Sequence, residues 1–348
     1  MIRQLSLATL LVAAPLAAQQ AERFTLPGNE VAISNLVGTL TVDQGSGSEV
    51  VVTVTRSGRD ASQLTVERAT LRGIPSLGVV YPGDRIIYPA MGRHSNTRFS
   101  IREDGTWNGP GWGQHRAGTH DIEVVGSGTG LEAAARLQIS VPAGRKVRVF
   151  LGAGAVDVAN TNGSLSVDVA SASITSHDTR GALSLDTGSG DIEVTGHDGG
   201  LNVDTGSGDV AVTSQKNGEL HIDTGSGSVR ASGITASVLK IDTGSGDIRL
   251  NDATATRASL ETGSGSIEAR FLAAIDDLAV ETGSGDVTLR LPEGLNVTVD
   301  LETSSGDLTL DFPVQLIRKE ENSLRGRIGE GKGRIAVESG SGDISLLR

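Results

Sequence analysis

The chain has 348 residues, of which 47 are glycine, none is cysteine and only 3% are aromatic, and its formal net charge is −12 at pH 7. This charge disfavours nucleic acids and anionic membrane surfaces as partners, because phosphate binding needs clustered lysine and arginine. The lack of cysteine excludes disulfides and thiolate metal sites. A hydrophobic content of 37% excludes a chain that is disordered throughout.

Residues 1–19 are predicted to be a secretory signal peptide. Arg3 supplies a positive charge, Leu5 to Ala14 form a short apolar run, and small residues follow up to Ala18. The run is shorter than the roughly 20 residues that a transmembrane helix needs, and no second run of membrane length follows. We therefore expect an exported protein, periplasmic or extracellular, with no membrane insertion once the signal is removed.

Residues 20–145 are predicted to form an N-terminal β region with an aromatic-rich insertion at 73–120. The segments VAISNLVGTLTV, from Val31, and LQISVPAGRKVRV, from Leu137, alternate apolar and polar residues as strands with one buried face do. The insertion holds both tryptophans, both tyrosines and three of the six histidines. We expect it to be a long loop or small insertion that projects from the N-terminal strands.

Residues 146–312 are predicted to be an array of repeats. The segment LSLDTGSGDIEV, which begins at Leu183, recurs along the chain. Its first turn glycine returns at steps of 18 to 20 residues, at Gly188, Gly206, Gly225, Gly244, Gly263 and Gly283. A period of this length is the signature of stacked structural units. The alternation within each copy predicts two short strands joined by Gly-Ser-Gly, with one face in a shared aliphatic core.

The predicted fold class is all-β: a β-solenoid, specifically a single-chain right-handed parallel β-helix of 18–20-residue two-strand repeats. Pairing of the two strands of each unit as a hairpin, in an antiparallel roll, fits the same inward positions and stays open. Residues 313–334 are predicted to be a basic excursion, and residues 335–348 a closing repeat at the end of the array.

Glycine and threonine recur at the corners of the repeats. Glycine suits a tight corner, either because φ is positive there or because stacked backbones come too close for a side chain. The threonines are expected to point inward beside the corner and to form hydrogen bonds. They are Thr187, Thr205, Thr224, Thr243, Thr262, Thr282 and Thr303.

These motifs together resemble a known family. The opening VAISNLVGTLTV, the segment ISVPAGRKVRVFLGAGAVDVANTNG, the serial DTGSGDI units and the closing RGRIGEGKGRIAVESGSGDISL are similar to the bacterial DUF4097 family of exported, adhesin-like β-repeat proteins. The resemblance covers most of the mature chain except residues 73–120. It implies a solenoid-like all-β fold and an adhesive or envelope role, and it carries no catalytic residues over to this chain.

A column of acidic residues is one candidate site. Stacked strands lie about 4.8 Å apart, so these carboxylates would form a ladder along one side of the array. The ladder is interpreted as a solvated face that keeps the protein soluble, or alternatively as a weak site for divalent cations. Its candidate members are Asp186, Asp204, Asp223, Asp242, Glu261 and Glu281.

Two known acidic motifs fit the repeats poorly. An aspartic protease needs one Asp-Thr-Gly loop in each of two facing lobes, whereas these loops recur every 18 or 19 residues. Calcium-binding β-rolls have G-G-x-G-x-D, and the order here is G-S-G-D. No cofactor is therefore expected.

The aromatic side chains of the insertion, Tyr81, Tyr88, Trp107 and Trp112, are the candidate ligand contacts, since they could form a surface on which a sugar stacks. The histidines His94, His115 and His120 have no common metal-ligand spacing. We expect a non-enzymatic, adhesin-like or structural interaction module of the cell envelope, with an envelope protein or a glycan as partner. A β-helix enzyme acting on polysaccharides and an accessory of envelope-stress signalling stay open as alternatives.

Overall fold

The computed structural model describes residues 21–102 and 119–348. This part of the chain consists of strands and turns, with two short 3₁₀ helices at Ala61–Gln63 and Pro89–Met91. The predicted all-β class is confirmed. The predicted signal peptide lies outside the described residues. Within the described ranges, no helix has the length and apolar character needed to cross a membrane.

The N-terminal strands gather around β2, which pairs in parallel with β5, β9 and β10. Strand β3 runs antiparallel to β1 and β9, and β4 runs antiparallel to β5. The bounds are β1 Ala21–Leu26, β2 Glu30–Gly45, β3 Val50–Ser57, β4 Thr65–Leu71, β5 Ile74–Val80, β9 Ala134–Pro142 and β10 Lys146–Ala159. Val31 of β2 is level with Val147 of β10, so the opening segment is stacked on the first repeat although it is distant in sequence.

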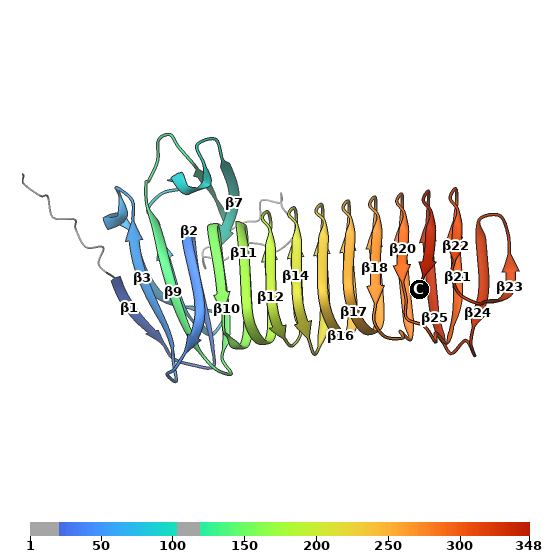
Figure 1. The fold of residues 1–348 in the computed structure, drawn as a ribbon. Helices are drawn as coiled ribbons and strands as arrows, with labels where there is room; N and C mark the ends of the chain where they lie inside the picture. The colour runs from blue at the N-terminus through green and yellow to red at the C-terminus, as the bar shows by residue number, and fades with distance from the viewer. Residues whose placement is uncertain (1–20, 103–118) are drawn as a thin grey trace, which may run out of the picture.

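The segment 73–120 contains regular structure where a long loop or small insertion was expected. Strand β5 belongs to the N-terminal sheet, because Leu77 and Val79 are buried against the core, so the projecting part begins only after β5. A separate sheet follows, in which β8 lies between β6 and β7. Its strands are β6 Arg85–Ile87, β7 Asn96–Arg102 and β8 Thr119–Val125. This sheet lies at the N-terminal end of the molecule (Figure 1).

From β10 onward the chain forms a rod of stacked coils, each of which we call a rung (Figure 1). Strands of neighbouring repeats pair in parallel: Leu183 is level with Leu201, and Leu201 with Leu220. The predicted solenoid of parallel rungs is thus confirmed, and the antiparallel roll is wrong for the repeats. The strands of the rod after β10 are β11 Asn162–Thr187, β12 Ile192–Asp198, β13 Leu201–Thr205, β14 Val210–Lys216, β15 Glu219–Thr224, β16 Val229–Thr243, β17 Ile248–Thr262, β18 Ile267–Phe271, β19 Asp277–Thr282, β20 Val287–Arg290, β21 Val297–Thr303 and β22 Leu308–Leu310.

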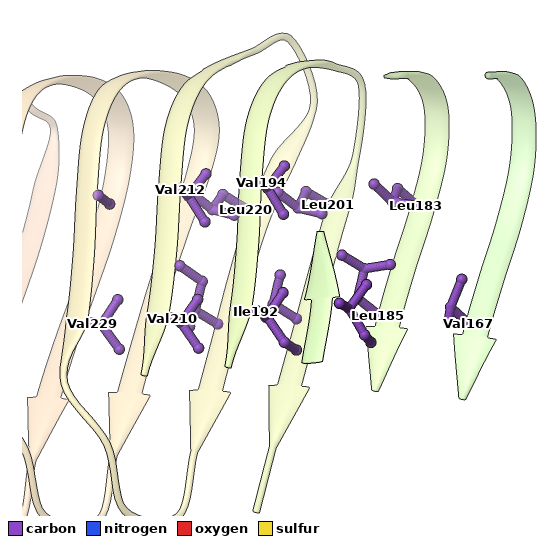
Figure 2. Close-up of a cluster of buried hydrophobic side chains, with 14 of the residues drawn as sticks. Val167, Leu183, Leu185, Ile192, Val194, Leu201, Val210, Val212, Leu220 and Val229 are labelled. Carbon is purple, nitrogen blue, oxygen red and sulfur yellow. The ribbon is translucent and has the colours of Figure 1, made fainter. Parts of the chain in front are cut away.

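Aliphatic side chains from both strands of each repeat fill the interior of the rod. Leu185, Val203 and Ile222 occupy the same position in successive rungs and are at most 2% exposed. Figure 2 shows other such columns, with Leu183, Leu201 and Leu220 in one row and Ile192, Val210 and Val229 in another. Burial of each such side chain contributes about 1.5–3 kcal/mol to the stability of the fold. The side chain is shielded from water only when a rung lies on each side of its own.

The earlier rungs of the rod, up to β17, bend at one corner more than the sequence predicted. The second strand turns at a residue in the left-handed conformation, with φ between 54° and 72°. This column consists of Asn160, Asp178, Gly196, Ser214, Gly233 and Asp252. Aspartate and glycine tolerate this conformation better than most residues. The corner was missed because its positions share no single residue type.

The predicted threonine column is confirmed. The seven threonines are 1–2% exposed, and each hydroxyl donates to a backbone carbonyl of the neighbouring rung at 2.8–3.3 Å. Thr243, for example, donates to the carbonyl oxygen of Gly227. The threonines therefore satisfy the corner carbonyls inside the rod, where water does not reach.

The last repeat does not close the array, contrary to the prediction. Strand β25 (Gly333–Ser339) lies between β19 and β21, and β26 (Ile344–Leu347) lies between β20 and β22. After β19 and β20 the chain thus leaves one position in the stack open and forms the rung of β21 and β22. It then returns, and β25 and β26 occupy the open position, as the strand order in Figure 1 shows. Ser339 donates to Gly285 on one side while Thr303 donates to Gly342 on the other, so the returning rung keeps the corner hydrogen bonds of the stack.

The basic excursion makes the end of the rod. Within residues 313–334, β23 (Gln315–Lys319) and β24 (Ser323–Ile328) form an antiparallel hairpin, and β24 pairs antiparallel with β21. Leu324 and Ile328 are buried against the last rung. An antiparallel strand thus ends the parallel stack, which limits further addition of rungs at this edge.

Candidate functional site

A cavity of about 290 Å³ lies where the N-terminal sheet meets the small sheet. Aliphatic side chains of Val79, Ile101 and Ile122 form part of its wall. Polar groups come from several strands: Asn35, Glu67, Tyr81, Arg102 and His120. An apolar wall with a few polar groups is the usual composition of a site for a small ligand.

Tyr81, a predicted ligand contact, lines this cavity and is 8% exposed. Its hydroxyl lies 2.9 Å from Asn35 Oδ1 and 2.8 Å from the carbonyl oxygen of Val37. Asn35 Nδ2 in turn donates to the carbonyl oxygens of Val37 and Ala135. Burial raises the pKa of Tyr81 far above its ordinary value. Tyr81 is therefore a neutral side chain anchored to the scaffold, and it offers a ligand its ring more than its hydroxyl.

The other predicted contacts are not brought together in the described structure. Tyr88 is not among the residues that line the cavity. It is half-buried against the core, and burial raises the pKa of its hydroxyl. Trp107, Trp112 and His115 lie outside the described residues. His120 is at the cavity, whereas His94 is exposed on a turn. An aromatic platform thus stays a prediction.

The small sheet beside the cavity is held by a charged cluster. Glu123 of β8 accepts hydrogen bonds from Arg98 and Asn96 of β7, and it also pairs with Arg85 of β6. The hydrogen bond from the Arg98 guanidinium has the largest effect on the pKa of Glu123, and it lowers this pKa. Burial acts in the opposite direction, whereas Asn96 and Arg85 lower the pKa further, so it lies below its ordinary value. One carboxylate therefore links all three strands of the small sheet, two of which carry the wall residues Ile101 and Ile122.

The acidic column is present as predicted, in one line along the rod. Asp186 is level with Asp204, Asp204 with Asp223, and Asp223 with Asp242, followed by Glu261 and Glu281. In the described part of the chain, no group of three or more histidine or carboxylate side chains has a geometry that could hold a metal ion. The cation ladder therefore stays a prediction, and its experimental test is calcium titration.

The first members of this column are half-buried, and this alters their protonation. Burial raises the pKa of Asp186 to about 7, with further contributions from Asp168 and Asp204. Burial, followed by the next carboxylate along the column, also raises the pKa of Asp204 and of Asp223. The folded chain thus holds protons on this column at pH values at which the unfolded chain has lost them.

The contribution of this column to the stability of the rod should consequently rise as the pH falls from about 8 to about 5, because these carboxyl groups bind more protons in the folded state than in the unfolded state. Asp186→Asn removes the charged form, so we expect the variant to be more stable than the parent at pH 8, by about 1–2 kcal/mol after allowance for solvent screening of a partly exposed group. The difference should vanish near pH 4. Urea unfolding at a series of pH values measures both effects.

Glu302→Gln is the matched control, because Glu302 is an exposed member of the same column. It should follow the parent at every pH. The buried His197 acts in the opposite sense, since burial lowers its pKa and stability is lost as the pH falls. It contributes equally to parent and variant and cancels from their difference. A constant difference between Asp186→Asn and the parent across this range would contradict the prediction.

A second set of carboxylates, directly after Gly-Ser-Gly, has a structural role that the sequence analysis missed. Asp191 Oδ1 accepts the backbone N–H of Asp209 at 3.0 Å, and Asp209 Oδ1 accepts that of Ser228 at 2.9 Å. The hydrogen bond from Ser228 lowers the pKa of Asp209. Asp247, Asp286 and Asp343 repeat the contact with the next rung. The recurrence of aspartate directly after the turn was the available signal.

The interior also contains a short polar column that sequence reasoning missed. The Thr179 hydroxyl forms a hydrogen bond of 2.9 Å with His197 Nδ1, and the other ring nitrogen lies 3.2 Å from the carbonyl oxygen of Gly200. In the next rung Gln215 donates to two backbone carbonyls, while its Oε1 has no hydrogen-bond partner. All three side chains are at most 2% exposed. His197 is therefore neutral and serves the packing of the rod.

Three solved structures match most of the chain at low sequence identity. A candidate cell adhesion protein from Clostridium sporogenes is 10% identical, with a TM-score of 0.22 over 94% of this chain and 98% of that one. A candidate adhesin from Bacteroides fragilis is 11% identical, with a TM-score of 0.39 over 96% and 99%. A candidate lipid-binding protein from Parabacteroides distasonis is 12% identical, with a TM-score of 0.41 over 94% and 96%. Likenesses at this level carry no argument about function.

No curated protein matches the chain. The family comparison is more specific, because the model described as Toastrack DUF4097 matches residues 135–347, which is more than half of the chain. The match spans β9 and the whole rod, including the returning last repeat. The chain therefore belongs to the Toastrack DUF4097 family.

Proposed function

We propose that this protein is an exported, non-enzymatic interaction module of the bacterial cell envelope, which binds a glycan or an envelope protein at the cavity beside Tyr81. The observation that supports the proposal is the cavity itself, which joins aliphatic walls to Arg102, Glu67 and His120 at the N-terminal end of a long rod. The rod is a right-handed coil in this proposal, and it serves as a rigid support that holds the cavity at a distance.

A non-enzymatic role is favoured by the environment of the described acidic groups. A glycosidase needs two carboxylates that flank one bond, about 5–10 Å apart across a cleft. Here the carboxylates of the column project side by side along one face, and those after the turns are occupied with backbone N–H groups. The cavity is lined by one carboxylate, Glu67, in the described part of the chain.

The test is a glycan array, with parallel analysis of any products, on the mature chain and on Ala69→Trp. Ala69 is an exposed residue at the cavity, so an indole there would fill the opening without a change to the core. Ala279→Trp, an exposed strand alanine on the rod, is the matched control. We expect Ala69→Trp to weaken binding at least about tenfold, as the loss of a filled pocket does, and Ala279→Trp to leave it unchanged.

Two results would overturn the proposal. Depolymerised products from the parent chain would favour the alternative of a polysaccharide-active enzyme. Binding that survives Ala69→Trp at full strength would place the ligand elsewhere.

A further inference from the structure

The hairpin β23–β24 forms the tip at the far end of the rod, and its outer strand, β23, does not cover the last rung. Strand β24 covers the last rung with Leu324 and Ile328. Strand β23 pairs with β24 only, and every one of its residues is exposed. Leu316 is 54% exposed and Ile317 is 59% exposed. Large aliphatic side chains are rarely left adjacent and open on a strand at the edge of a sheet.

A β-bulge in β23 contributes to this exposure. The pairing with β24 shifts between Leu316 and Arg318, which leaves Ile317 as the extra residue. Bulges re-aim side chains, and they are frequent at functional edges. Among the described residues, the other exposed large aliphatics are Val80 and Leu272, which are separate from each other in the chain. The tip is thus the place where two exposed large aliphatic side chains, Leu316 and Ile317, are adjacent in sequence.

A local excess of positive charge surrounds these two side chains, although Asp300 of β21 lies across from Arg325 on its other side. Arg318 lies directly across from Arg325, and Arg327 lies two pairs further along the same hairpin, across from Gln315. Like charges opposite each other on neighbouring strands destabilise a sheet unless an anion compensates them. Arg318 pairs with Glu320, but within the described ranges Arg325, Arg327 and Lys319 have no ion pair. The chain as a whole is acidic, so this basic tip is a local exception.

We propose that the hairpin β23–β24 docks on the surface of an anionic lipid bilayer. Leu316 and Ile317 would enter the interface, while Lys319, Arg325 and Arg327 would meet the headgroups. Basic residues beside exposed aliphatic side chains are the combination that holds peripheral proteins on such surfaces. The acidic column on the side of the rod would be repelled by the same surface. Contact is therefore confined to the tip, at the opposite end from the small sheet (Figure 1).

The experiment is co-sedimentation of the mature chain with phosphatidylcholine vesicles, with and without about 30% phosphatidylglycerol. We expect binding to the anionic vesicles only, and its loss in about 0.5 M NaCl, because salt screens the attraction. The double variants Leu316→Ser/Ile317→Ser and Arg325→Glu/Arg327→Glu should each bind at least about tenfold more weakly. Leu272→Ser and Arg257→Glu, exposed residues on the rod, are the matched controls and should bind as the parent does.

A polarity-sensitive label gives an independent measurement, because the chain contains no cysteine. Labelled Ile317→Cys should show a blue-shifted emission with anionic vesicles, and labelled Leu272→Cys should not. No binding to anionic vesicles, or equal binding by the parent and the tip variants, would overturn the proposal. Tip-dependent binding of soluble polygalacturonate without vesicle binding would also overturn it, in favour of an acidic glycan. None of these variants alters the cavity, so the outcome is independent of the glycan-array result.

Discussion

Replacement of Gly246 by alanine should lower the stability of the rod by about 3 kcal/mol, at the upper end of the usual cost of overpacking. Gly246 is the second glycine of a Gly-Ser-Gly turn, and a Cβ there would come under 3.0 Å from the carbonyl group of Gly227 in the rung below. The obstacle is backbone, which cannot rotate away. The φ of Gly246 lies outside the left-handed region, so the loss would come from stacking alone. The midpoint of urea unfolding, followed by far-UV circular dichroism, measures it.

Gly47→Ala is the control for the change of residue type, because no atom lies within 4 Å of a Cβ built at Gly47. We expect its effect to stay within about 0.5 kcal/mol of zero, as for most surface substitutions. Equal losses in the two variants would show that the turn glycines act through chain flexibility, and the explanation by close stacking would fail.

Ile335→Ala should cost about 2–5 kcal/mol, the range for removal of a fully buried aliphatic side chain. Ile335 belongs to the last repeat of the sequence, and it is 0% exposed because β25 lies between β19 and β21. Its side chain contacts the interior on both sides, so its loss would leave a cavity that neither neighbour can close. Urea unfolding again provides the measurement.

Ile317→Ala is the matched substitution at the true end of the rod, where the side chain is 59% exposed. We expect a change of less than about 0.5 kcal/mol there. If the last repeat were the terminal rung, Ile335 would have a core on one side only and its loss would be mild. A small effect of Ile335→Ala would therefore argue against the returning order of the strands.

The repeat columns show how far the sequence alone could reach. The positions of Leu183, Leu201 and Leu220 were predictable as equivalent and inward, because alternation and a regular period both express burial. The inward threonines followed from their place beside the turn. The left-handed corner at Asp178, Gly196 and Ser214 could not be predicted from the sequence, because the residues that adopt this conformation differ in type from one rung to the next.

The candidate site was much less predictable. Tyr81 could be singled out as an aromatic residue in an unusual segment, but the cavity depends on Asn35, Ile101 and Ile122, which come from separate strands. The role of the hairpin tip was hidden for a similar reason. A net charge of −12 argued against anionic surfaces, because a sum over the chain does not show where its 30 lysines and arginines gather.

The amino-acid sequence by itself determined the unit of this protein: a short β coil with aliphatic interior, threonine beside the corner and glycine at the turn. These properties are local, because each rung meets nearly the same surroundings as its neighbours. The order of the rungs was decided only by the tertiary structure. The last copy carries the same inward residues as the others, so it fits at any level of the stack, and the long connection through 313–334 lets it enter beside β19. The cavity likewise exists only where distant strands meet, at the end of the rod beside the small sheet.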